Sequence, residues 1–77
     1  MPRYFFDTRD GDRFFRDDVG DDLPDINSVL KEASRFLGEL ARDVLPGSTK
    51  RVLTVEVRDG LRRVLEARLT FEAVVLV

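Results

Sequence analysis

The stretch from Pro24 to Leu45 constrains the fold most, because it is the only segment of the chain with sustained helical periodicity. Its apolar residues recur at steps of three and four, which places them on one face of a helix. They are Ile26, Val29, Leu30, Ala33, Leu37, Leu40, Ala41 and Val44. Pro24 suits a first helical turn, and Pro46-Gly47 ends the helix. We therefore expect one amphipathic helix, with Leu37 and Leu40 among its most buried residues.

Short strands joined by tight turns are predicted on both sides of this helix. Residues 2–8 are rich in aromatics, and residues 13–17 read as the returning strand. Residues 51–58 and 61–71 alternate apolar and polar side chains across an Asp-Gly turn. The order is ββαββ, a single α+β domain over residues 1–77 with one helix packed on a four-stranded, mainly antiparallel sheet. The expected strand order is 2-1-3-4.

The second hairpin can be assigned a register from its apolar pattern. A two-residue loop at Asp59-Gly60 sets Leu53 opposite Glu66 and puts a charge on the core face. A three-residue loop at residues 58–60 pairs Leu53 with Leu65 instead. The second register is therefore predicted.

The same loop geometry in the first hairpin pairs Phe6 with Phe14 and Phe5 with Phe15. If Phe6 faces the helix, Phe5 and Phe15 lie together on the sheet face that has no helix. An adjacent aromatic pair on an open face indicates a contact surface. The alternative is that the sheet twists enough to shelter the two rings, or that the first strand uses its opposite face.

Composition narrows the functional classes. The chain has no Cys and no His, which excludes a disulfide scaffold and leaves its serines and threonines without a recognisable base. We therefore expect no enzyme, no catalytic residues and no cofactor. No apolar run approaches the roughly 20 residues that cross a bilayer, and residues 1–6 are too short for a signal peptide. A cytoplasmic protein without membrane contact is expected.

Five aspartates between residues 17 and 25 make an acidic loop before the helix. They are Asp17, Asp18, Asp21, Asp22 and Asp25. Carboxylate oxygens suit Ca²⁺ or Mg²⁺, but the spacing is not that of an EF-hand. A solvated turn that caps the helix is the favoured interpretation, and no metal site is assigned.

Basic residues gather in the second half of the chain, although the formal net charge is −2. The arginines concerned are Arg51, Arg58, Arg62, Arg63 and Arg68. With aromatic rings on an open sheet, they would suit a single-stranded nucleic acid. Three glutamates interleave with them, so a salt-bridged surface is favoured and a nucleic-acid partner is not.

The C-terminal residues 73–77, AVVLV, form an unbroken apolar run. An exposed β-prone segment of this kind favours edge pairing, so it needs cover. Two solutions remain open. Either the last strand continues alongside the first strand, or Val74, Val75 and Leu76 pair with a second copy and form a homodimer.

A resemblance to one known family covers nearly the whole chain. It is carried by MPRYFF at residues 1–6, by Asp10-Gly11, by Asp17 and Gly20, and by Leu23-Pro24-Asp25. In these motifs the chain is similar to the DUF6894 proteins, short uncharacterised proteins of rhizobial-type alphaproteobacteria. The resemblance implies no catalytic or binding residues. Asp7 stands where the family usually has His, so a function of that His would not carry over.

These observations favour a non-enzymatic protein-interaction or accessory module that self-associates. Its surface would comprise Phe5, Phe15, Val74, Val75 and Leu76, and its protein partner is unknown. The alternative is a weak nucleic-acid binder that uses the open sheet face and the second-hairpin arginines.

Overall fold

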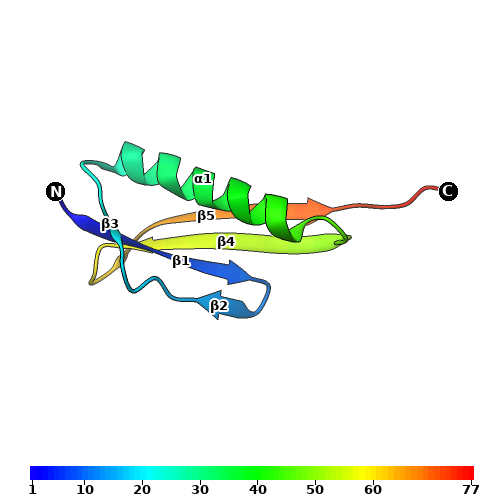
Figure 1. Ribbon diagram of the computed structural model, residues 1–77, viewed down its shortest axis with the longest axis horizontal. Helices are drawn as coiled ribbons and strands as arrows, with labels where there is room; N and C mark the ends of the chain where they lie inside the picture. The colour runs from blue at the N-terminus through cyan, green and yellow to red at the C-terminus, as the bar shows by residue number, and fades with distance from the viewer.

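The computed structural model describes residues 1–77 and has one helix lying on one face of an antiparallel sheet (Figure 1). In chain order the elements are β1 (Arg3–Asp10), β2 (Arg13–Phe15), β3 (Asp21–Asp22), α1 (Ile26–Val44), β4 (Lys50–Arg58) and β5 (Arg63–Glu72). The α+β class is confirmed. The main strands lie in the order β2-β1-β4-β5, as expected, and the sheet differs from the prediction by the short β3, which pairs with β1.

Helix α1 begins at a capped end and presents a narrow buried stripe. The Asp25 carboxylate accepts a hydrogen bond from the Ser28 N–H at 2.8 Å, which satisfies one of the unpaired amides of the first turn. Val29, Ala33, Leu37 and Ala41 are the buried residues. Leu37 therefore lies where it was expected. Leu40 is only half-buried, because it falls on the flank of the stripe that faces the β1–β2 side.

The core lies between α1 and the central strand β4. Leu53, Val55 and Val57 are fully buried on β4, and Phe6 joins them from β1. The Phe6 and Phe36 ring centroids are 5.3 Å apart, so the helix also contacts β1. Burial of these apolar side chains is the main stabilising term for so small a domain.

The predicted register of the second hairpin is wrong by four residues. Leu53 pairs with Leu69, and Leu65 pairs with Val57. The loop is longer because the Asp59 carboxylate accepts hydrogen bonds from the Leu61 and Arg62 N–H groups, while the Asp59 N–H donates to the Arg62 carbonyl. The shift is an even number, so the apolar side chains still face the core as predicted.

The predicted register of the first hairpin is wrong by three residues, and here the faces change. Asp10 pairs with Arg13 across a two-residue turn whose Gly11 has φ +63°. A glycine with positive φ at the first central position is typical of the tight turns that join two strands. Thr8 consequently pairs with Phe15. Because an odd shift reverses a strand's faces, Phe15 points to the helix side of the sheet.

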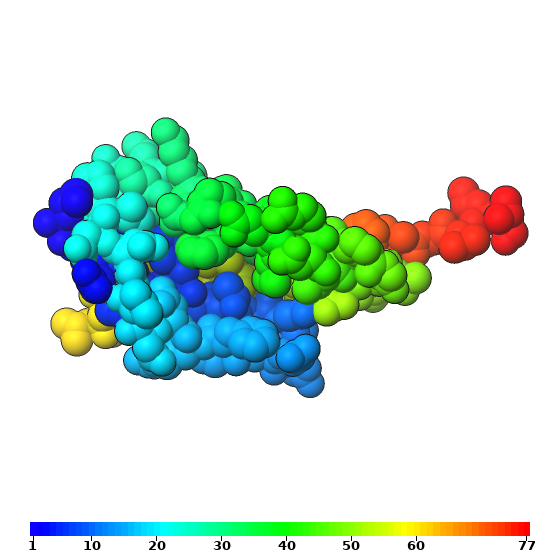
Figure 2. Space-filling view, in the orientation of Figure 1, coloured from blue at the N-terminus to red at the C-terminus, as the bar shows by residue number.

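The C-terminal segment leaves the body of the protein after β5. The Ala73 N–H donates to the Thr49 carbonyl at 2.8 Å, and residues 74–77 beyond it are exposed. Figure 2 shows this tail projecting past the sheet. The expectation that the last strand continues alongside the first strand is wrong, because β4 lies between β5 and β1.

Candidate interaction site

Phe5 and Phe15 do not form a joint surface. Phe5 is half-buried on the open face, where the Arg58 guanidinium lies 4.5 Å from its ring centroid. Gly20 packs against it so closely that a Cβ there would lie 2.9 Å from the Phe5 ring. Phe15 is half-exposed on the helix side. The predicted aromatic pair is wrong because the first hairpin has the two-residue turn described above.

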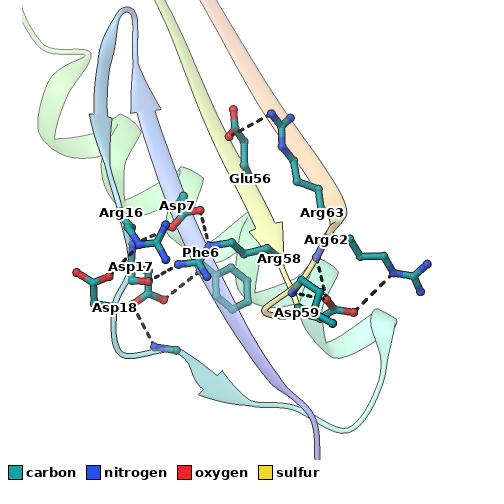
Figure 3. Close-up of polar contacts among 12 residues, drawn as sticks. Phe6, Asp7, Arg16, Asp17, Asp18, Glu56, Arg58, Asp59, Arg62 and Arg63 are labelled. Carbon is teal, nitrogen blue, oxygen red and sulfur yellow. Dashed lines mark hydrogen bonds and ion pairs between the residues drawn. The ribbon is translucent and has the colours of Figure 1, made fainter.

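A buried polar network replaces the predicted aromatic pair on the open face (Figure 3). The Arg58 Nε donates to an Asp7 carboxylate oxygen at 2.9 Å, and its Nη2 donates to the Asp17 carbonyl at 2.8 Å. The Asp17 N–H donates to the other Asp7 oxygen at 2.8 Å. Asp7 is only 6% exposed. The network therefore joins β4, β1 and the loop after β2.

The Asp17 carboxylate holds the acidic loop against β1. It accepts hydrogen bonds from the backbone N–H groups of Phe6, Val19 and Gly20, at 2.9–3.1 Å. Burial raises the pKa of Asp17, but these three donors and the charge of Arg58 outweigh it and hold the pKa below its ordinary value. The loop is thus an ordered structural element. No group of three or more His, Cys, Asp or Glu side chains is placed to hold a metal ion.

The five second-hairpin arginines are all paired with carboxylates of the same chain. Arg58 and Arg51 make the closest contacts, to Asp7 at 2.9 Å and to Asp10 at 2.7 Å. The other pairs are Arg62–Asp59, Arg63–Glu56, Arg63–Glu66 and Arg68–Glu66. The positive charge that could meet a phosphate backbone is therefore balanced within the protein.

A groove of about 500 Å³ lies between α1 and the β1–β2 side (Figure 2). Phe6, Phe15 and Phe36 contribute apolar surface, and Glu39 and Asp43 lie on its helix side. The groove follows from the sheet being wider than the helix: α1 packs over β4 and β5, and little covers the short β2.

The free edge of β5 and the tail form the second candidate surface. Strand β5 pairs with β4 on one side and with no strand on the other. Val74, Val75 and Leu76 follow it, exposed by 71%, 76% and 90%. These three predicted site residues therefore follow the C-terminal end of a strand with one free edge, whereas Phe5 and Phe15 belong to β1 and β2. Leu61, in the β4–β5 loop, is also fully exposed.

Sequence reasoning missed the Asp7–Arg58–Asp17 network. One signal was present: Asp7 alternates with Phe6 and so had to point away from the helix. Its partners come from 10 and 51 residues along the chain. Separations of that size leave no local pattern.

Comparison with known proteins identifies a family and nothing closer. A family model described as a domain of unknown function, DUF6894, matches residues 3–72 of 77. No curated protein and no solved structure matches the chain. No helix of the protein is long and apolar enough to cross a membrane.

Proposed function

We propose that this chain, which belongs to the DUF6894 family, is a non-enzymatic protein-interaction module that self-associates. The observation that carries the proposal is that the ten-residue strand β5 has one unpaired edge and is followed by an exposed apolar tail. Natural proteins usually blunt or cover a long free edge, because its unpaired N–H and C=O groups are a template for another strand. A second copy would supply that cover.

The chemistry of the side chains supports an interaction role over catalysis. Cys and His are absent, and the buried acids Asp7 and Glu56 each face an arginine. Asp17 is held by backbone donors. A nucleophile beside a base, or a carboxylate pair at a cavity, would be needed for acid–base or covalent catalysis. Glu39 and Asp43 line the groove, but Glu39 is ion-paired with Arg35 and Asp43 is largely exposed beside Arg42, so neither is desolvated in the way that tunes a catalytic acid or base.

Nucleic-acid binding is the second candidate, and the structure offers it less support. Each second-hairpin arginine has a carboxylate partner, and Phe5 is covered by Arg58 and Gly20. Fluorescence anisotropy with single-stranded RNA and DNA at low and high salt tests it. Micromolar binding that weakens steeply with salt would favour this candidate over the interaction module.

Light scattering across a concentration series tests the self-association. We expect the mass of the parent to rise from one chain towards two as its concentration increases. When residues 74–77 are deleted, the same rise should need a higher protein concentration. A full-length variant with serines at 74–77 controls for chain length and should behave like the deletion. A parent that stays monomeric at millimolar concentration would contradict the proposal.

A further inference from the structure

We propose that two copies pair antiparallel through β5, about a twofold axis at Ala67, so that the two sheets become one. This proposal rests on the proposed self-association and names its interface. The partner is therefore a second copy of this chain, and the site is the free edge of β5 with the tail that follows it.

The backbone groups of β5 are oriented for this pairing. The Ala73 N–H donates to Thr49 across the β4–β5 ladder. In an antiparallel pair, alternate residues direct both backbone groups to the same neighbour. The backbone N–H and C=O groups of the odd-numbered residues of β5 therefore point towards β4. Those of the even-numbered residues, such as Glu66 and Arg68, point towards the free edge. A second strand can bond to them without disturbing the first ladder.

The charges of β5 select the register. Glu66 and Arg68 lie on the open face, on either side of Ala67. An isologous pair has residue i opposite j and j opposite i. With the axis at Ala67, Glu66 of each copy lies opposite Arg68 of the other. A twofold axis at Glu66 or at Arg68 would set identical charges opposite each other, which is destabilising. The helix face agrees, because Leu65 then lies opposite Leu69.

The same register brings the exposed tail of one copy close to the exposed Leu61 of the other. With Ala67 opposite itself, Ala73 lies opposite Leu61 of the second copy. Leu61 is 100% exposed in the single chain, and the exposed tail begins at Val74. The tail of each copy thus passes the β4–β5 loop of the other. Two apolar features that have no cover in one chain acquire it by one symmetry operation.

The helices fit the same arrangement. Helix α1 packs over both β4 and β5, so two copies joined at β5 carry their helices side by side. With strands about 4.8 Å apart, the two helix axes would be about 10 Å apart, a normal packing distance. By helical angle, Leu30 and Gly38 lie on the flank away from the groove. Leu30 is half-exposed, and a Cβ on Gly38 would meet nothing within 4 Å.

Disulfide trapping tests the position of the axis, because the chain has no cysteine of its own. Directly opposite residues of a non-hydrogen-bonded pair are close enough for a disulfide. We expect Ala67→Cys to form a covalent dimer under mild oxidation. Ala73→Cys is the matched control, since two copies of residue 73 would lie roughly 40 Å apart. Equal trapping of both variants would overturn the register.

Charge reversal tests the pairing without cysteine. Glu66→Arg and Arg68→Glu each set like charges opposite at two symmetric places, and we expect each to weaken the dimer by on the order of tenfold. The double variant Glu66→Arg/Arg68→Glu restores opposite charges and should restore the parent dissociation constant. Arg16→Glu, an equal charge change at a similarly exposed arginine far from β5, is the control and should leave dimerisation unchanged.

The outcomes separate this proposal from the one on which it rests. A dimer that Arg68→Glu weakens no more than Arg16→Glu, or that the double variant fails to restore, would overturn the β5 interface while self-association stands. A parent that never dimerises would overturn both. Circular dichroism melting curves check that each variant is folded under the conditions in which its dimerisation is measured.

Discussion

The two edges of the sheet are built differently, although the chain turns near both with the same tripeptide, Arg-Asp-Gly. At residues 9–11 the tripeptide leads into a two-residue turn and the short strand β2. At residues 58–60 it opens a longer loop, closed by the Asp59 N–H to the Arg62 carbonyl, and the long strand β5 follows. The β2 side is tied down by Asp17 and Arg58, whereas the β5 edge has no neighbour.

This difference shows that an edge is closed by polar contacts from distant parts of the chain, not by its turn sequence. The loop after β2 bonds to β1 and β4 through Asp7, Asp17 and Arg58, which give partners to the Phe6 N–H, the Asp17 N–H and the Asp17 carbonyl. Nothing equivalent reaches β5. We call the β2 side the closed edge and the outer side of β5 the open edge. The free energy of unfolding should therefore be sensitive to substitution and pH at the closed edge, and should change little on substitution at the open edge.

The largest effect is expected at the closed edge from Arg58→Met. This change leaves the buried Asp7 carboxylate without its cation, which should lower the free energy of unfolding by about 4 kcal/mol. Arg68→Met, on the open edge, removes an exposed pair and should cost less than about 1 kcal/mol. Urea denaturation measures both. Equal losses would break the comparison.

A smaller effect is expected from Gly20→Ala, where the acidic loop packs on β1. Its φ is +77°, and the new Cβ would lie 2.9 Å from the Phe5 ring, so strain and overpacking together should cost about 2–3 kcal/mol. Gly47→Ala is the matched control, because its φ is +88° and nothing lies within 4 Å of its Cβ. It should cost about 1 kcal/mol. If the two melting temperatures fall by the same amount, the loop is not packed as described.

The closed edge should also be acid-sensitive. The pKa of Asp17 is lower in the folded protein than its ordinary value of 3.8, so its stabilising contribution is complete above about pH 4 and is lost as the pH falls through the folded value. Denaturation curves at pH 7, 5 and 3 should show stability falling between the last two. Asp17→Asn should reduce that fall. An unchanged pH profile in the variant would exclude Asp17 as its source.

The smallest effect is expected from Thr70→Pro on the open edge. The Thr70 N–H points away from β4, so in dilute monomer the loss should stay within about 1 kcal/mol. Leu69→Pro, the matched control, removes an N–H that faces β4 and should cost about 3 kcal/mol. Similar stabilities for the two proline variants would show that the alternation of backbone groups along β5 is assigned wrongly.

Local pattern was enough to predict the main elements and the faces of the core. The helix from Ile26 to Val44 and the buried face of β4 follow from periodicity and turn residues. The apolar run at Val74, Val75 and Leu76 was also recognised, although cover was expected for it and the structure leaves it exposed. These features depend on residues a few positions apart, where spacing alone determines which side chains share a face.

Registers and polar contacts depended on the tertiary structure. The Asp59 carboxylate capped a longer loop than the Asp-Gly signal predicts, and Gly11 made a shorter one. Hydrogen bonds from backbone amides to a nearby side chain change the relative free energies of alternative loops by small amounts. Residue type alone therefore does not predict which loop length forms.

By itself, then, the sequence determined one helix, the long strands and their apolar faces, because alternation and helical spacing are properties of neighbours. Only the tertiary structure decided that Asp7 and Arg58 form an ion pair, that Phe5 and Phe15 lie on opposite faces of the sheet, and that the segment after β5 lies without cover. Those outcomes depend on which distant groups satisfy one another's charge and hydrogen bonds when the chain folds, and a buried polar group must find such a partner wherever it lies in the chain.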